Sequence, residues 1–205
     1  MDSLDEISRI RRELKDGERK TVSLTRRYDA EVEDVWEACT DGERIARWFM
    51  PVSGDLRLGG TYQLEGNAGG EILDCEPPSY LRVSWLFGLD PGFSEVEVRL
   101  SPEGGGTLFE LRHTAEVPPE MWGRYGPGAV GVGWDLALLG LGLHLSGAPL
   151  PDKAGFELTG EGRSYITASS RAWGEAFEQA GASPESAATA VAATTDFYLP
   201  TEDQS

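Results

Sequence analysis

Between residues 55 and 114, hydrophobic and polar side chains alternate with a period of two, which is the period of a β-strand. Glycine and proline pairs interrupt this alternation at Gly59-Gly60, Gly69-Gly70, Pro77-Pro78 and Gly104-Gly105-Gly106. Such interruptions are typical of hairpin turns. The alternating stretches cover residues 61–66, 71–76, 80–87, 94–100 and 107–116. The pattern predicts a meander of five or six antiparallel strands.

One face of this sheet is expected to be covered. Residues Val96, Val98 and Leu100 alternate with charged neighbours, as in an antiparallel sheet that is packed on one side. The predicted cover is a helix over residues 126–145, where apolar residues recur at helical spacing: Val130, Trp134, Leu138, Leu141 and Leu145. Gly131, Gly133, Gly140 and Gly142 within it each destabilise a helix by about 1 kcal/mol relative to alanine. We therefore expect either a close approach of this helix to the sheet or room for a bound molecule.

The remaining segments read mostly as helices. Leu4, Ile7 and Leu14 recur at helical spacing and predict an amphipathic helix within the first sixteen residues. A strand is expected over residues 21–28, followed by short helices at 32–39 and 41–48 and by two C-terminal helices at 164–180 and from 184 onward. We divide the chain into an N-terminal helical arm (1–19), an α+β domain (20–146), and a connector with a C-terminal helical extension (147–205).

Composition narrows the choice of partners. The 205 residues include 18 basic and 35 acidic side chains, a formal net charge of −17, which repels nucleic acid and anionic membrane surfaces. The charged N-terminus lacks the apolar stretch of a signal peptide, so we expect a cytoplasmic protein. Cys39 and Cys75 lie in no metal or redox motif and are expected to be reduced, buried thiols.

Several strings resemble a known family. They are RYDAEVEDVWEACTDGERIARWF, the Gly59-Gly60 turn, GEILDCEPPSYLRVSW, GTLFELRHTAE and GVGWDLALLGL, in this order. Together they resemble the activator of heat-shock protein 90 ATPase homologue family, within the START and birch-allergen-like (SRPBCC) superfamily, over about residues 20–145. The resemblance implies a helix-grip fold: a curved antiparallel sheet wrapped around a long helix, with an internal cavity. It does not imply one function, because this superfamily includes ligand carriers, sensors, cyclases and co-chaperone modules.

Catalytic arrangements find little support in the sequence. His113 and His144 are the only histidines, and neither has a companion at metal-ligand spacing. His113 shares a strand face with Phe109 and Leu111, so it is either a structural residue or a polar group that orients a ligand. No nucleophile elbow, phosphate-binding loop or paired carboxylates can be recognised, so we assign no catalytic residue, metal or cofactor.

What remains is a set of aromatic and apolar residues that a curved sheet and a glycine-spaced helix would place around a cavity. The predicted lining is Trp48, Phe49, Tyr62, Glu71, Leu73, Trp85, Val98, Phe109, Leu111, His113, Trp134 and Leu138. Tyr62, His113 and Glu71 are the polar members, expected to orient the bound molecule.

Three functions stay open at this point. We expect a non-enzymatic protein that binds a small hydrophobic or aromatic molecule as a carrier, a sensor or in a stress-related role. The first alternative is a co-chaperone-like module that acts on a chaperone ATPase through its surface. The second is a cyclase- or hydrolase-type enzyme for a polyketide-like substrate. The C-terminal extension is expected to pack on its own domain, with homodimer formation as the alternative.

Overall fold

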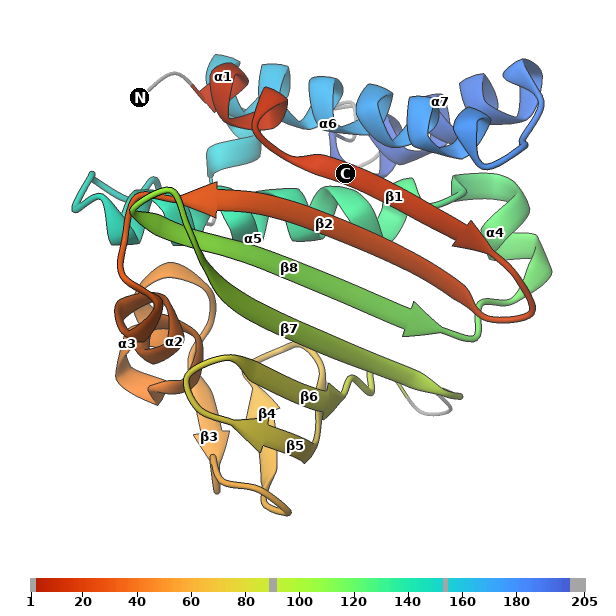
Figure 1. The fold of residues 1–205 in the computed structure, drawn as a ribbon. Helices are drawn as coiled ribbons and strands as arrows, with labels where there is room; N and C mark the ends of the chain where they lie inside the picture. The colour runs from red at the N-terminus through yellow and green to blue at the C-terminus, as the bar shows by residue number, and fades with distance from the viewer. Residues whose placement is uncertain (1–2, 89–91, 153–154, 200–205) are drawn as a thin grey trace.

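A curved, eight-stranded antiparallel sheet forms the framework of the computed structural model, which describes residues 3–88, 92–152 and 155–199 (Figure 1). The strands are β1 (Arg11–Asp16), β2 (Lys20–Tyr28), β3 (Val52–Gly54), β4 (Thr61–Leu64), β5 (Gly69–Glu76), β6 (Tyr80–Ser84), β7 (Ser94–Glu103) and β8 (Gly106–Ala115). They lie in the order β1-β2-β8-β7-β6-β5-β4-β3. The predicted meander and the α+β class are confirmed. Gly69-Gly70, expected as a turn, instead begins β5.

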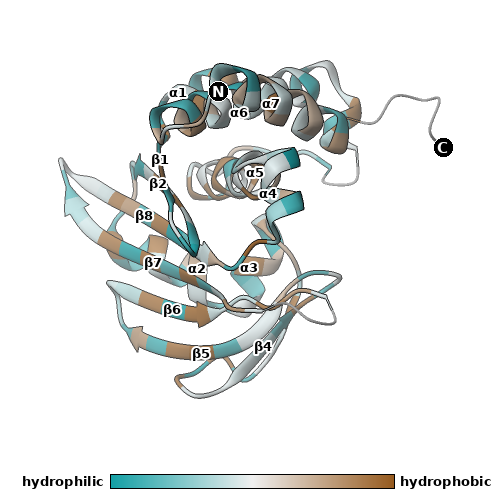
Figure 2. Cartoon of the chain, turned by 90° about the vertical axis from the view of Figure 1, so that its right-hand side faces the viewer, coloured by the Kyte–Doolittle hydropathy of each residue, from teal (hydrophilic) through white to brown (hydrophobic). Residues whose placement is uncertain are grey.

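Several of the helices form two layers beside this sheet (Figure 2). They are α1 (Ser3–Ser8), α2 (Val32–Thr40), α3 (Gly42–Trp48), α4 (Pro119–Tyr125), α5 (Gly128–Leu145), α6 (Gly160–Gln179) and α7 (Pro184–Tyr198), with a short 3-10 helix at Phe156–Leu158. Figure 2 shows α5 between the sheet and an outer layer of α1, α6 and α7. The long helix is therefore covered on both sides.

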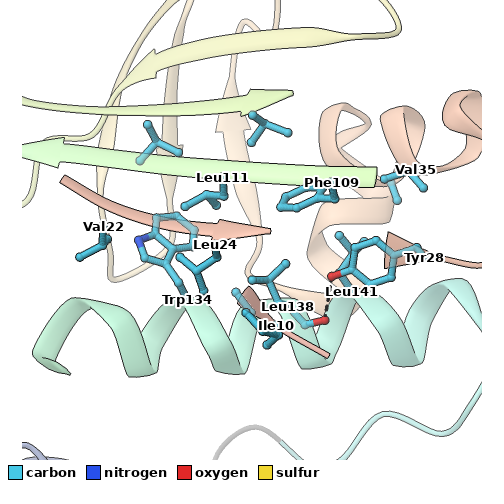
Figure 3. Packing of buried hydrophobic residues seen from close by; sticks show 14 of the residues in the cluster. Ile10, Val22, Leu24, Tyr28, Val35, Phe109, Leu111, Trp134, Leu138 and Leu141 are labelled. Atoms are coloured by element: carbon cyan, nitrogen blue, oxygen red, sulfur yellow. Dashed lines mark hydrogen bonds between the residues drawn. The ribbon is translucent and has the colours of Figure 1, made fainter. Parts of the chain in front are cut away.

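The sheet buries one face against α5, as the alternation predicts. Val96, Val98 and Leu100 are buried, and Val98 pairs with Leu111 of β8 in the β7–β8 register. Trp134 and Leu138 point from α5 toward this face (Figure 3). Apolar residues at helical spacing on α5 thus meet apolar residues at strand spacing on the sheet, which forms one continuous core.

The N-terminal arm differs from the prediction. The helix ends at Ser8, and residues Arg11–Asp16 form the edge strand β1, in which Leu14 pairs with Val22 of β2. The segment is rich in charged residues, so its own sequence offers no strand pattern. Its conformation comes from backbone pairing with β2, a tertiary contact that the helical spacing from Leu4 to Leu14 cannot reveal. A charged edge strand also discourages pairing with other chains.

Two glycines of α5 make room for the C-terminal helices. A Cβ on Gly131 would lie 2.2 Å from the Trp173 ring of α6, and one on Gly128 would lie 2.5 Å from Thr194 Oγ1 of α7. Trp173 is fully buried as a result. The C-terminal extension therefore packs on its own domain, as expected. Val130, predicted on the covered face of α5, is instead 40% exposed.

A buried carboxylate joins α5 to two other elements. Asp135 Oδ2 accepts hydrogen bonds from Arg12 Nε of β1 and Trp173 Nε1 of α6, both at 3.1 Å, and from the Ser169 hydroxyl. Asp135 is fully buried, and burial raises its pKa, although the Arg12 guanidinium opposes that rise. This group holds the N-terminal strand and the C-terminal extension to the same helix. The sequence analysis did not single it out.

A second buried ion pair joins helix α1 to strand β2. Glu6 of α1 is fully buried and accepts from the guanidinium of Arg26, which also donates to the Leu138 carbonyl at 3.2 Å.

Among the described helices, α5 alone is long and apolar enough to span a membrane by length and composition, and more than half of it is buried within the protein. It serves here as the core helix.

Candidate functional site

An apolar cavity of about 160 Å³, named here the inner cavity, lies among the sheet, α5 and the α2–α3 pair. The chain lines it with one residue from α5 and with residues from α2, α3 and strands β3 to β8. Its wall consists of Cys39, Thr40, Ile45, Trp48, Phe49, Val52, Leu56, Tyr62, Leu64, Ile72, Cys75, Leu81, Val83, Trp85, Val96, Val98, Phe109, Leu111 and Trp134. None of these side chains is charged.

Aromatic rings form a contiguous group on this wall. Phe49 stacks on Trp48 at 5.3 Å between ring centroids and lies 6.3 Å from the Trp134 ring. Trp85 lies 5.0 Å from Trp134 and 6.3 Å from Tyr62. These separations fall in the range of favourable aromatic contacts. The rings come from α3, β4, α5 and the segment after β6, so the fold brings together residues that are far apart in sequence.

The indole N–H groups on the wall differ in their partners. Trp48 Nε1 donates to the Ala38 carbonyl at 2.9 Å, and Trp134 Nε1 donates to His113 Nδ1 at 3.1 Å. Trp85 Nε1 makes no hydrogen bond within the described residues, and its side chain is only partly buried. Trp85 is therefore the tryptophan on this wall whose indole N–H has no partner among the described residues.

The predicted polar members of the site are placed differently from expectation. Tyr62 lies on the wall, but its hydroxyl donates to the Ser84 carbonyl at 2.8 Å, and burial raises its pKa. His113 lies behind Trp134 and lines a separate small space beside α4 rather than the inner cavity. Both ring nitrogens of His113 have partners, since Nε2 lies 2.8 Å from Ser94 Oγ. Of the two roles considered for His113, a structural residue or a group that orients a ligand, its hydrogen bonds support the structural one.

Glu71 and Leu73 are absent from the wall because β5 contains a bulge. The β5–β6 register shifts between Ile72 and Asp74, so Leu73 is an extra residue in the strand. Ile72 and Cys75 consequently face the inner cavity, while Glu71 is exposed. Strict alternation, on which the prediction rested, cannot anticipate a bulge.

Leu138 belongs to the core and does not line the inner cavity. It is 2% exposed, and its carbonyl accepts a hydrogen bond from the Tyr28 hydroxyl at 3.0 Å (Figure 3). The other eight predicted apolar and aromatic residues line the cavity together: Trp48, Phe49, Tyr62, Trp85, Val98, Phe109, Leu111 and Trp134. The wall residues that the prediction missed come mainly from α2, α3 and the facing sides of β5 and β6.

Two free thiols, Cys39 and Cys75, lie on the same wall. Each is partly buried. Burial raises the pKa of Cys39 to about 12 despite the nearby Arg44, and burial raises the pKa of Cys75 as well. Both side chains are thiols at neutral pH and therefore weak nucleophiles. Within the described ranges, no group of three or more His, Cys, Asp and Glu side chains could hold a metal ion.

Comparisons with known proteins agree with this architecture. Residues 29–145 match the family described as Activator of Hsp90 ATPase homolog 1-like protein. No protein with a curated description matches the chain.

Solved structures extend the likeness beyond that segment. The crystal structure of CalU16 from Micromonospora echinospora is 39% identical, with a TM-score of 0.66 over 85% of this chain and 99% of that one. The solution structure of CalU16 gives 40% identity and a TM-score of 0.69, over 84% of this chain and 97% of that one. Protein MLL2253 from Mesorhizobium loti is 25% identical, with a TM-score of 0.54 over 63% of this chain and 99% of that one. The match to the family over more than half of the chain, on a helix-grip fold, shows that this chain belongs to the Activator of Hsp90 ATPase homolog 1-like protein family.

Proposed function

We propose that the protein binds a small hydrophobic or aromatic molecule in the inner cavity. The observation that carries this proposal is the wall itself, which encloses an apolar space with a contiguous group of aromatic rings and without a charged side chain. Each square ångström of apolar ligand surface removed from water contributes about 25 cal/mol to binding. A hydrophobic guest is favoured for this reason, and a charged one would be left without a partner.

The volume limits the size of the guest. A cavity of about 160 Å³ is similar to the engineered apolar cavities of roughly 150 Å³ that hold one benzene molecule. The inner cavity as it stands therefore accommodates about one aromatic ring. A larger molecule requires Phe49 or Trp85 to move, and both side chains are only partly buried.

Trp85 supplies the polar contact in this proposal. Its free indole N–H would donate to a hydroxyl or carbonyl oxygen on the guest, while the ring packs against the apolar part. Tyr62 and His113, expected from the sequence to orient the ligand, already have protein partners. A hydroxylated or carbonyl-bearing aromatic compound is thus the preferred class.

The two alternative functions gain less support. Catalysis on a polyketide-like substrate needs an acid or base at the cavity, and the wall offers only thiols with raised pKa values and hydroxyl groups that are hydrogen-bonded within the protein. Action on a chaperone would use the surface, where Phe87 and Leu58 are 65% and 61% exposed. Nothing in the shape of that surface indicates a particular partner.

The test compares phenol with benzene, which fit a cavity for one aromatic ring and differ by one hydroxyl group. Binding is measured by isothermal titration calorimetry and by thermal shift on the wild type, Val98→Trp and Trp85→Phe. Val98→Trp fills the cavity and should abolish binding of both compounds. Trp85→Phe keeps a ring but removes the N–H, so it should weaken phenol binding by about fivefold to tenfold and benzene binding much less.

Phe87→Ala serves as the matched control, because this aromatic residue lies two positions after Trp85 but is exposed. It should leave both affinities unchanged. Binding that survives Val98→Trp in a folded protein would place the guest elsewhere. An absence of binding by either compound would contradict the proposal and direct attention to the protein surface.

A further inference from the structure

A second and larger cavity, named here the outer cavity, lies on the side of α5 that faces away from the sheet. Its volume is about 610 Å³, against about 160 Å³ for the inner cavity. Pockets that bind drug-sized molecules measure roughly 300–1,000 Å³. The outer cavity, and not the inner one, therefore has the size of a complete small-molecule site.

The C-terminal extension creates this space. Leu136 and Leu143 of α5 form one side, Ile166 of α6 another, and Phe156 of the connector and Tyr198 at the end of α7 close it further. At its edge, Leu158 is 75% exposed and Phe197 is 60% exposed. Large apolar side chains exposed beside an apolar hollow are typical of a surface that a hydrophobic molecule covers.

One cationic group faces this cavity. Arg163, near the start of α6, is the basic residue among the described lining residues, and its guanidinium has no carboxylate within ion-pair distance in the described chain. Glu157 also lines the cavity and is the acidic residue there, so the site is not uniformly positive.

We propose that the outer cavity binds an apolar molecule that carries a single carboxylate, with the apolar body against α5 and α6 and the carboxylate on Arg163. The guanidinium matches a carboxylate in shape and can donate two parallel hydrogen bonds to it. The proposal concerns a site that the inner cavity does not include, and it stands independently of the function proposed above.

The two cavities share one partition. Trp48 and Phe49 line both of them, and their rings are stacked at 5.3 Å. A guest in the outer cavity therefore contacts the same pair of rings that limits the size of the inner one. Binding at either site should alter the environment of Trp48.

The experiment uses decanoate as the charged probe and 1-decanol as its uncharged counterpart, titrated into the full-length protein by isothermal titration calorimetry. Arg163→Glu removes the cation and adds a repulsive charge at an exposed position. It should weaken decanoate binding about tenfold and leave 1-decanol unchanged. Arg171→Glu is the matched control, because Arg171 is an exposed arginine of the same helix that lines none of the described cavities. It should change neither affinity.

Two filling variants assign the site. Leu136→Trp, in the outer cavity, should abolish binding of both probes, whereas Val98→Trp, in the inner cavity, should not. The reverse result would overturn the proposal and place the probes in the inner cavity, in line with the function proposed above. Equal decanoate affinity in Arg163→Glu and the wild type, or no decanoate binding at all, would also overturn it. Arg163 is exposed, so its variant remains informative if Leu136→Trp fails to fold.

Discussion

Trp134 Nε1 on α5 donates a hydrogen bond to His113 Nδ1 on β8, and the two rings meet edge to face at 5.8 Å and 86°. An indole nitrogen can only donate, so Nδ1 must accept and the proton of neutral His113 lies on Nε2, which donates to Ser94 Oγ at 2.8 Å. A single side chain thus fixes the tautomer of a buried histidine, joins the core helix to the sheet and forms part of the cavity wall.

Replacing Trp134 with phenylalanine should destabilise the protein by about 1–3 kcal/mol, because His113 Nδ1 would then be buried without a donor. Urea denaturation measures the change. Trp122→Phe provides the comparison, since the Trp122 indole donates to Asp16 Oδ2 at 3.3 Å at an exposed position, and it should cost less than about 0.5 kcal/mol. Similar losses in the two variants would argue against the buried hydrogen bond.

Stability should fall as the pH drops through the titration of His113. Burial lowers the pKa of His113 from 6.5 to about 4, so between these values the unfolded chain binds a proton that the folded chain does not. The contribution is fully present above pH 6.5, is lost as the pH falls toward 4, and amounts to about 3 kcal/mol.

Two measurements check this pH dependence. Proton NMR of the histidine ring protons gives the pKa directly, with His144→Gln used to assign the two signals. Urea denaturation across pH 4 to 6.5 should show a smaller slope in His113→Gln than in the wild type. A His113 signal that titrates near 6.5 in the folded protein would contradict the predicted shift.

Arg12→Gln should destabilise the protein by about 3–5 kcal/mol near neutral pH, since Asp135 would remain buried without its cation. Burial already raises the pKa of Asp135, and losing Arg12 raises it further, so the deficit should shrink at lower pH, where Asp135 takes up a proton. Thermal unfolding at several pH values tests both statements. Arg11→Gln changes the neighbouring exposed pair with Glu13 and should matter by less than about 1 kcal/mol.

Gly131→Ala and Gly123→Ala should change stability in opposite directions. The new Cβ at Gly131 would meet the buried Trp173 ring at 2.2 Å and should destabilise by about 1–3 kcal/mol or more. Gly123 lies inside α4 with nothing within 4 Å, so alanine there should stabilise by up to about 1 kcal/mol. Melting temperatures report both changes. Tolerance of Gly131→Ala would mean that α6 packs less closely on α5.

Much of the fold could be predicted because its two main periodicities are strong. The strands from Thr61 to Ala115 and the helix Gly128–Leu145 lie where alternation and helical spacing indicate, and Asp41 caps α3 by accepting from the Arg44 amide, as its position before that helix suggests. The same patterns located most of the aromatic wall. Elements determined by local sequence were thus accessible without a structure.

The features that escaped prediction depend on contacts between distant segments. The bulge at Leu73 reverses which β5 residues face the cavity, and β1 acquires its conformation only through pairing with β2. The glycines of α5 predicted a close approach to the sheet or room for a bound molecule, but Gly131 instead lies against the Trp173 ring of α6. Asp135 could have been recognised from the sequence, since a single acidic residue within an apolar helix predicts a buried polar or charged partner.

Because α5 lies between the sheet and the layer of α1, α6 and α7 (Figure 2), the protein cannot be shortened freely at either end. The segment that matches the family, 29–145, omits β2, which occupies the sheet between β1 and β8, and omits α6 and α7, which cover the outer side of α5. A fragment trimmed to those limits would leave the edge of β8 unpaired and would expose an apolar helix with the length of a membrane span. We expect such a fragment to aggregate, so a shortened form of the protein should retain β2, α6 and α7.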